Sequence, residues 1–273
     1  MIIVRVSGGL GNQMFQYALG RRLAHFHQSA LKLDVSIFKT YKLHDYCLKH
    51  LNIIENIASL EEIVRLKKKR WIFRLGKQFV KQRFFHFDPK ILDLPDNVYL
   101  KGYWQSERYF KDIEGIIRKD FSFKKRPDKN NKNILKKILK SNSVSIHVRR
   151  GDFVVKGCGT CGISYYKKAI NLIKNKVAGP VFFVFSDDPD WCKVNLNINK
   201  NMTFVDFNSR DKNYEDLRLI SSCKYNIICN STFSWWGAWL NKNKNKIVIA
   251  PKKWFNNLTI DTSDAVPKTW LQI

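Results

Sequence analysis

The chain has no apolar run that approaches the roughly 18 residues of a membrane-spanning helix. It also lacks a signal peptide, because residues 2–6 (IIVRV) are typical of a strand and neither a basic leader nor a small-residue cleavage site accompanies them. These absences argue against a helical membrane protein and predict a cytoplasmic location. In that compartment the six cysteines are expected to be free thiols.

Metal-binding signals are scarce as well. Cys158 and Cys161 form a C-x-x-C pair, but no second such pair lies nearby to complete a four-ligand zinc site. Residues 188–190 (DPD) have the spacing of a D-x-D metal motif, yet the central proline favours the start of a helix. The sequence therefore predicts no metal site.

Acidic residues are few: 23 Asp and Glu stand against 49 Lys and Arg, which gives a formal net charge of +26. Such a charge is compatible with a nucleic acid, an anionic membrane or a phosphorylated substrate as partner. No RRM, KH, helix-turn-helix or zinc-finger signature supports a nucleic acid. Lys- and Asn-rich runs at 129–133 and 241–246 are expected to be solvated loops that contribute part of the excess.

The window 63–87 has no acidic residue and holds nine basic residues interleaved with large apolar ones. A basic, aromatic-rich amphipathic segment is typical of peripheral binding to an anionic membrane surface. The same pattern fits a helix that packs Trp71, Phe79 and Phe84 on the core and leaves its basic face in water. The sequence leaves both interpretations open.

Apolar strand-like runs alternate with helix-like segments along most of the chain. Residues 2–6 lead through a glycine-rich turn, 7–13, into a helix over 14–27, which is the first βα unit of a nucleotide-type fold. Further strands are expected at 31–34, 98–100, 143–147, 181–185, 202–205, 225–229 and 246–250, and further helices at 107–119, 164–176, 214–222 and 233–240. This alternation predicts parallel sheets covered on both faces.

The polar segment 124–133, which contains Pro127, is the best candidate for a domain boundary. We therefore expect an α/β protein with two Rossmann-like halves facing a cleft. The expected domains are 1–130 and 131–273.

The strand expected at 143–147 ends in His147 and is followed by Arg149, Arg150 and Asp152. Ligands of open α/β sheets bind at the carboxyl ends of the strands. The guanidinium group matches phosphate oxygens bidentately, so an adjacent Arg pair at this position indicates a diphosphate site. The alternative is a surface ion pair of little energetic value.

Two further loops could bind an anion. Residues 230–234 (NSTFS) open a helix, whose N-terminus attracts anions; alternatively, Ser231 or Thr232 is an ordinary N-cap. The glycines of 8–13 (GGLGNQ) would let the backbone approach a ligand closely, or form only a tight turn. The tryptophans of the following helix, Trp235, Trp236 and Trp239, are expected in the core.

Three motifs together resemble glycosyltransferase family 11, the α-1,2-fucosyltransferases, and the resemblance runs from residue 1 to about 255. The motifs are GGLGNQMFQYA (8–18), HVRRGD (147–152) and NSTFSWWGA (230–238). Without an anchor segment, the chain is most similar to the bacterial members. The His-x-Arg-Arg-x-Asp element alone also occurs in α-1,6- and protein O-fucosyltransferases.

The resemblance implies a GT-B-like fold and inverting transfer of L-fucose from GDP-β-L-fucose, with no cofactor and no required metal. The implied acceptor is the 2-hydroxyl of a galactose-terminated oligosaccharide, which could be lipid-linked, as in lipopolysaccharide or O-antigen biosynthesis. The implied location is the cytoplasm, with possible peripheral contact at the inner face of the membrane through 63–87. No nucleic acid is implied as partner.

The resemblance also implies roles for single residues. Arg149 and Arg150 would grip the two phosphates, and Ser231, Thr232 and Ser234 would complete the phosphate cradle. Gly9 and Gly11 would also take part in donor binding. His147 would contact the nucleotide, unless it is a core histidine. Asp216 would accept hydrogen bonds from guanine, unless it is a solvated acid at a helix start. Asn12 would lie near the reacting sugar.

The general base is the least determined role. An inverting transfer needs the acceptor hydroxyl deprotonated, and Asp152 is the first candidate, although it could instead orient the Arg pair. Tyr103, Trp104, Gln105 and Glu107 lie in the half that such folds use for the acceptor. A transferase of another donor or linkage, or a basic nucleic-acid-binding protein, remains the alternative function.

Overall fold

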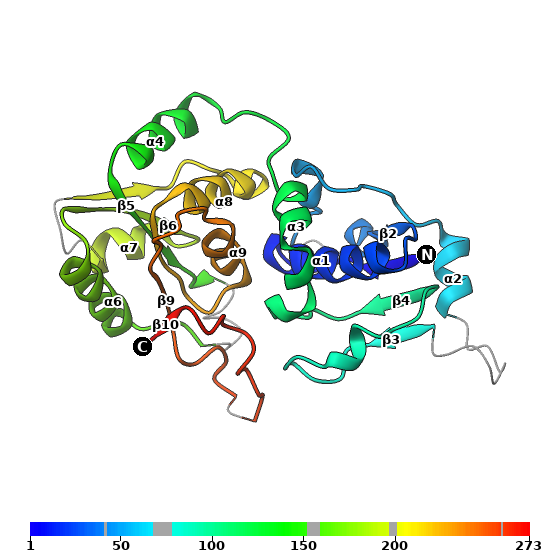
Figure 1. Ribbon diagram of the computed structural model, residues 1–273. Coiled ribbons are helices and arrows are strands. Elements are labelled where there is room, and N and C mark those ends of the chain that lie inside the picture. Colours follow the sequence, from blue (N-terminus) through cyan, green and yellow to red (C-terminus); the bar gives the residue numbers. More distant parts are fainter. Residues whose placement is uncertain (41–42, 68–77, 152–158, 197–200, 258) are drawn as a thin grey trace. The chain divides into compact units, whose positions relative to one another are not determined.

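The structure is a computed structural model that describes residues 1–40, 43–67, 78–151, 159–196, 201–257 and 259–273 (Figure 1). The chain divides into two compact units. The first comprises residues 1–124 together with 261–265, and the second comprises residues 125–260 together with 266–273. Each unit is built on its own parallel sheet.

The first unit holds a four-stranded sheet in the order β2-β1-β4-β3 (Figure 1). Its strands are β1 (Ile2–Arg5), β2 (Leu31–Asp34), β3 (Phe79–Lys81) and β4 (Val98–Lys101), and every pairing is parallel. The central strand β1 is a continuous apolar run because helices cover both faces of a parallel sheet. The helices are α1 (Leu10–Phe26), α2 (Leu60–Lys67) and α3 (Glu114–Asp120).

Two elements of this unit differ from the expectation. Helix α1 begins four residues earlier than expected, with Gly9 as its N-cap, so the glycine-rich turn is the first turn of the helix. The helix expected at 107–119 is shorter, because two 3-10 turns, Glu107–Tyr109 and Lys111–Ile113, precede α3. The break lies at Phe110, whose φ of −149° is not helical.

The second unit holds a six-stranded parallel sheet in the order β10-β9-β8-β5-β6-β7. Its strands are β5 (Asn142–Val148), β6 (Pro180–Ser186), β7 (Met202–Val205), β8 (Tyr225–Ile227), β9 (Val248–Ala250) and β10 (Leu271–Gln272). From β5 the chain adds β6 and β7 on one side, then returns to add β8, β9 and β10 on the other. The strand order therefore reverses between β5 and β8.

Helices cover both faces of this sheet. They are α4 (Lys129–Leu139), α6 (Ile163–Lys176), α7 (Pro189–Asn195), α8 (Asn213–Ser222) and α9 (Thr232–Leu240). Val144 and Ile146 of β5 pack with residues of α6 and α7, whereas Phe183 and Phe185 of β6 pack with residues of α4 and α8. The alternation of side chains along a strand explains this division.

Expectations for the ends of this unit hold in part. Trp235, Trp236 and Trp239 are buried, as expected. The DPD segment starts α7, with the Asp188 side chain accepting from the backbone N–H of Trp191 at 3.2 Å. Strand β8 ends two residues earlier than expected, and β9 begins two residues later.

The two Lys- and Asn-rich runs are not simply solvated loops. Residues 129–133 are the first turns of α4, because Asp128 caps the helix and Asn131 is buried. Residues 241–246 form a loop, but Lys246 Nζ donates to the carbonyl groups of Ala238, Trp239 and Asn241. A lysine is well placed there because the last carbonyls of α9 lack helical partners.

The basic window is described only outside residues 68–77. Ile63 and Leu66 of α2 pack on Ile3 and Tyr99, whereas Phe79 and Phe84 are 40% and 55% exposed. The interpretation that these residues face the core is therefore wrong for Phe84, whereas Phe79 stacks one side of its ring on the buried Tyr99. Trp71 lies outside the described residues. In the part of the chain that the structure describes, no helix is long and apolar enough to cross a membrane.

Candidate functional site

The carboxyl edge of the second sheet is the first candidate site, at the point where the strand order reverses. Open α/β sheets bind ligands in the crevice at such a point. Strands β5 and β8 pair directly, from Val144 opposite Tyr225 to Ile146 opposite Ile227. The loops that follow them carry the HVRRGD and NSTFS motifs, so the fold brings these two motifs to one edge.

The Arg pair follows β5 and is bound by two carboxylates that follow β6. Arg149 Nε lies 3.1 Å from Asp187 Oδ2, and Arg150 Nε lies 3.2 Å from Asp188 Oδ2. Asp187 also accepts from the backbone N–H of Arg150 at 2.9 Å. The Arg150 guanidinium carbon lies 4.1 Å from the ring centre of Trp191. Both arginine side chains therefore have a defined direction at the strand ends.

These ion pairs orient the arginines more than they stabilise the fold. The Arg149 and Arg150 side chains are 26% and 24% exposed, and such pairs contribute about 0–1 kcal/mol. Gly151 leaves room for the arrangement, because a Cβ there would lie 2.7 Å from Asp187 Oδ2. An incoming anion can thus meet guanidinium groups whose direction is already set.

Sequence reasoning missed Asp187 and Asp188 as the partners of the Arg pair. It offered Asp152 for that role, and Asp152 lies outside the described residues, as does Cys158. A usable signal was present in the order of the strands. The runs 143–147 and 181–185 were expected as consecutive parallel strands, so residues just after both runs meet at one edge.

His147 lies at the end of β5 on the face covered by α9. It is buried, its Nδ1 lies 3.1 Å from Cys229 Sγ, and its ring centre lies 5.4 Å from that of Phe233. Burial, together with the nearby Arg149 charge, lowers the pKa of His147 to about 3. The imidazole is therefore neutral, and it can donate or accept a hydrogen bond but adds no charge to the site.

The loop after β8 is a capped helix start. Ser231 is the N-cap of α9 and accepts from the backbone N–H of Phe233 at 3.3 Å, while Thr232 is the first helical residue and is partly exposed. Ser234 is fully buried, and its hydroxyl donates to the Ser231 carbonyl. Asn230 Nδ2 donates to the Gly159 and Trp254 carbonyls and so ties three loops together.

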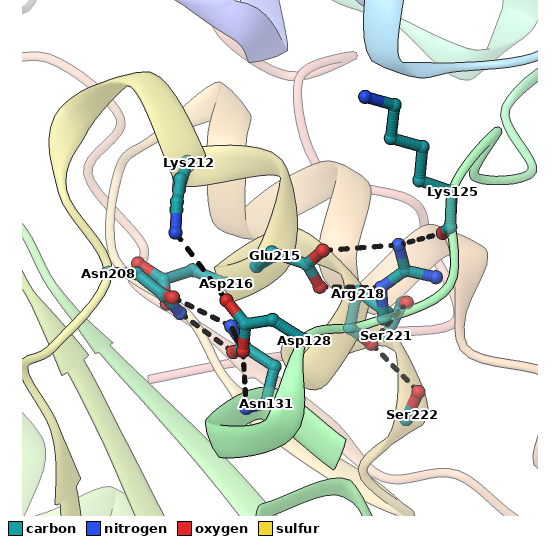
Figure 2. Close-up of polar contacts among 10 residues, drawn as sticks. All are labelled: Lys125, Asp128, Asn131, Asn208, Lys212, Glu215, Asp216, Arg218, Ser221 and Ser222. Carbon is teal, nitrogen blue, oxygen red and sulfur yellow. Dashed lines mark hydrogen bonds and ion pairs between the residues drawn. The ribbon is translucent and has the colours of Figure 1, made fainter.

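Asp216 belongs to a polar cluster on the first turns of α8 (Figure 2). Its Oδ1 accepts from Asn208 Nδ2 at 2.7 Å, and Asn208 exchanges two amide hydrogen bonds with the buried Asn131 of α4. Burial raises the pKa of Asp216 to about 7, with a smaller contribution from the neighbouring Glu215 carboxylate, while the hydrogen bond from Asn208 acts in the opposite direction. Asp216 is therefore not a freely solvated acid.

The neighbouring Glu215 has a different environment. It is buried and pairs with Arg218 Nε at 2.7 Å, while Arg218 also donates to the Lys125 carbonyl (Figure 2). This pair ties α8 to the chain segment at the start of the unit. Asp216 is the carboxylate of the two that lacks a cationic partner among the contacts drawn in Figure 2.

The carboxyl edge of the first sheet carries the glycine motif. Gly8 has a φ of +77°, which favours glycine, Gly9 caps α1, and Gly11 is buried in the first turn. Asn12, in that same turn, accepts through Oδ1 from Gln105 Nε2 at 2.9 Å. The structure thus joins Asn12 to one of the residues expected on the acceptor side. Tyr103 is 45% exposed, whereas Trp104 is fully buried.

Within the described residues, no group of three or more His, Cys, Asp or Glu side chains is arranged to hold a metal ion. The five described cysteines are free thiols. Positive charge at the second edge comes from the arginines.

The three motifs lie within one family match. The model of Glycosyl transferase family 11 matches residues 1–273. The chain belongs to glycosyltransferase family 11. The resemblance drawn from the three motifs is thereby confirmed.

Two bacterial proteins are similar to this family 11 glycosyltransferase along its length. An alpha-1,2-colitosyltransferase of Escherichia coli is 36% identical, with 100% of this chain and 99% of that protein covered. The O-antigen biosynthesis glycosyltransferase WbnK of Escherichia coli is 31% identical, with 95% and 97% covered.

Among solved structures, the family 11 chain resembles the alpha-1,6-fucosyltransferase NodZ soaked with GDP-fucose. The TM-score is 0.52 at 13% identity, over 88% of this chain and 91% of that chain. At this identity the likeness concerns the fold alone. The prediction of an α/β, GT-B-like fold with two Rossmann-like halves is confirmed.

Proposed function

We propose that this glycosyltransferase transfers L-fucose from GDP-β-L-fucose to the 2-hydroxyl of a galactose-terminated glycan, with inversion at the anomeric carbon. The observation that carries the proposal is the oriented Arg pair at the reversal of strand order. Guanidinium groups at this point suit a diphosphate leaving group. The second unit is assigned to the donor and the first to the acceptor.

The donor contacts are assigned as follows. Arg149 and Arg150 bind the diphosphate and stabilise the charge that develops on it as the glycosidic bond breaks. The start of α9, with Ser231 and Thr232, offers a helix N-terminus to the same anion, and Ser234 supports that turn. Gly9 and Gly11, at the start of α1, are also assigned to donor binding. Neutral His147 packs on the nucleotide.

Asp216 is the proposed reader of guanine. Guanine presents N1–H and N2–H₂ as neighbouring donors, and an ionised carboxylate accepts from both. Asn208 holds the Asp216 side chain in place, because its Nδ2 donates a hydrogen bond to Asp216 Oδ1. Because the pKa of Asp216 is raised to about 7, binding of guanine would favour the ionised form and draw the proton off.

The transfer itself needs a nucleophilic acceptor oxygen and a neutralised leaving group. The 2-hydroxyl loses its proton while the bond to GDP breaks on the opposite face of the sugar. Asp152 is the proposed base. If Asp152 does not act, a loose transition state with early departure of GDP would demand little help from a base. Asn12, which is assigned a place near the reacting sugar, donates a hydrogen bond to an oxygen of that sugar.

The sugar on the donor has one specific rival. Colitose, the 3-deoxy form of fucose, is a second candidate for the donor sugar, because the chain is similar to an alpha-1,2-colitosyltransferase. A site that hydrogen-bonds a hydroxyl rejects an analogue without it by about 10⁴-fold, whereas an apolar pocket discriminates only about 10–200-fold. The ratio of kcat/KM for GDP-fucose and GDP-colitose therefore decides between them.

The test of the proposed function uses the purified protein, a galactoside acceptor and a panel of nucleotide sugars. Transfer from GDP-fucose, with an α-1,2 linkage in the product, is the expected result. Transfer from GDP-colitose alone would shift the donor assignment, and transfer only from UDP- or ADP-sugars would refute the guanine assignment. Binding of random oligonucleotides without any transferase activity would instead favour the nucleic-acid alternative.

The protein is further proposed to act in O-antigen or lipopolysaccharide biosynthesis, in the cytoplasm and in peripheral contact with the inner face of the membrane. The exposed Phe79 and Phe84 and the basic residues of the 63–87 window support this contact. The protein should pellet with anionic vesicles at low salt and not with neutral ones. Protein that stays in the supernatant with both would contradict the contact.

A further inference from the structure

The amide of Asn12, which follows β1, is held by a residue that follows the neighbouring strand β4. Gln105 follows β4, lies 93 positions from Asn12 in the sequence, and donates from Nε2 to Asn12 Oδ1 at 2.9 Å. Gln105 is 8% exposed, whereas Asn12 is partly exposed. A buried side chain thus orients a more accessible one at the carboxyl edge.

The loop that delivers Gln105 has an unfavourable conformation. Trp104 has a φ of +47°, in the left-handed region that is strained for a bulky residue. Its indole Nε1 is buried and has no hydrogen-bond partner among the described residues, which adds the desolvation cost of an unpaired donor. Strain of this kind persists only where the surroundings impose it, and it gathers at functional sites.

Two other glutamines impose that conformation. Gln82 Oε1 accepts from the backbone N–H groups of Tyr103 at 2.7 Å and Trp104 at 3.2 Å. Gln16 Nε2 donates to the Gly102 carbonyl at 3.0 Å. The loop is therefore fixed from β3 and from α1, and Gln105 reaches Asn12 as a result.

The hydrogen bond decides which end of the Asn12 amide is available. Because Oδ1 accepts from Gln105, the Nδ2 group is turned away from that contact and toward Gly8. A Cβ on Gly8 would lie 2.9 Å from Nδ2, so glycine leaves room for this orientation. The side chain thereby presents a donor, which suits a sugar or phosphate oxygen and cannot take up a proton.

We propose that Gln105 is a positioning residue that fixes the Asn12 amide with its Nδ2 donor, and not Oδ1, directed at the reacting sugar. The proposal rests on the proposed function for the location of Asn12 near that sugar. In this proposal Gln105 does not contact the donor nucleotide. It affects the rate of sugar transfer only by orienting Asn12.

The decisive variant is Gln105→Glu. It keeps the shape but offers only acceptors, so the Asn12 amide must turn and donate Nδ2 to the new carboxylate. We expect kcat to fall about a hundredfold. KM for GDP-fucose should stay within about threefold of wild type, and the thermal shift with GDP should stay within about one degree of wild type. Gln105→Lys keeps a donor toward Oδ1 and should retain kcat within about fivefold.

Two further variants separate orientation from charge and from folding. Asn12→Asp still accepts from Gln105 but loses the Nδ2 donor, so kcat should fall as in Gln105→Glu. The exposed Gln28 offers a control, because Gln28→Glu makes the same chemical change away from the site and should leave kcat unchanged.

Wild-type kcat in Gln105→Glu or in Asn12→Asp overturns the proposal. Equal losses in Gln105→Lys and Gln105→Glu also overturn it, because they would mean that Gln105 serves only the fold. Failure of wild type to bind GDP or to transfer fucose is a separate result and would refute the proposed function.

Discussion

The contacts around the Arg pair of the second sheet differ in chemistry from those around Asn12 of the first sheet. At the second edge, two arginines are paired with two aspartates. At the first edge, the last residues of the strands are charged, but the contacts that hold Asn12 and the loop after β4 come from neutral amides. Gln105 binds the Asn12 side chain, while Gln16 and Gln82 bind backbone groups of that loop. Charged groups suit a diphosphate, and fixed neutral donors and acceptors suit an uncharged sugar. Under the proposed function, this difference would be a division of labour in which the Arg pair binds the leaving group and the amides bind the reacting sugar.

The largest effect should come from removing a charge at the second edge. Arg149→Ala should reduce kcat at least a hundredfold, about 3 kcal/mol, because the leaving diphosphate loses a charge-assisted contact in the transition state. Steady-state kinetics on a variant with unchanged circular dichroism measures this. A folded variant with near wild-type kcat would remove Arg149 from the mechanism.

Asp216→Asn should weaken GDP binding about tenfold or more, because an amide cannot accept from both guanine donors. The raised pKa of Asp216, about 7, sets the pH dependence. Wild-type affinity for GDP should fall as pH decreases below 7, since the carboxyl must be ionised to accept. Calorimetric titration over roughly one to two pH units on either side of that pKa measures both effects.

The raised pKa of Asp216 should affect the stability of the ligand-free protein in the opposite direction to GDP affinity: stability should fall as pH rises. The folded protein holds the Asp216 proton up to a pKa of about 7, whereas the unfolded chain releases it near the ordinary value of 3.8. Stability therefore falls as pH rises between these values. The nearby Glu215, Asp128, Lys212 and Arg218 remain in the variant. Ligand-free Asp216→Asn should melt at a higher temperature than wild type above pH 7; a lower Tm would contradict the buried carboxylate.

A smaller loss is expected when the orientation of an arginine is disturbed but its charge is kept. Asp187→Asn removes the ionic partner of Arg149 while retaining an acceptor for the Arg150 backbone N–H. We expect kcat to decrease about fivefold to tenfold, with no change in Tm beyond a few degrees. A loss as large as that of Arg149→Ala would mean that Asp187 takes a direct part in the reaction.

No effect is expected from a chelator. The arginines are assigned the neutralisation of the diphosphate, so activity should survive EDTA. Loss of activity in EDTA, with recovery on adding Mg²⁺ or Mn²⁺, would show that a metal ion shares the task of the Arg pair.

The sequence predicted the second edge better than the first. Continuous apolar runs identify parallel strands, and the Arg pair directly follows one of them, so both the sheet and the arginines could be located. Their partners Asp187 and Asp188 depend on which strands are neighbours. The contact of Gln105 with Asn12 joins residues 93 positions apart through a strained loop, and no local pattern reports it.

Helix capping explains why residues 129–133 form a helix and not the loop that the sequence predicted. Residues 129–133 are polar enough to be typical of a loop, but Asp128 caps them into α4 and Asn131 is buried beside Asn208. Asp216 was identified by the resemblance, whereas its burial and its raised pKa follow only from the packing of α4 and α8. The burial of Asn131 and the environment of Asp216 therefore depend on contacts between distant parts of the chain, which a local sequence pattern does not report.

The division of labour is tested most directly by titrating GDP into three proteins in parallel: wild type, Arg150→Ala and Asn12→Ala. GDP affinity should fall about tenfold or more in Arg150→Ala and stay within about threefold of wild type in Asn12→Ala, although Asn12→Ala loses transfer activity. Equal affinity in wild type and Arg150→Ala, or a loss confined to Asn12→Ala, would contradict the assignment of the diphosphate to the Arg pair.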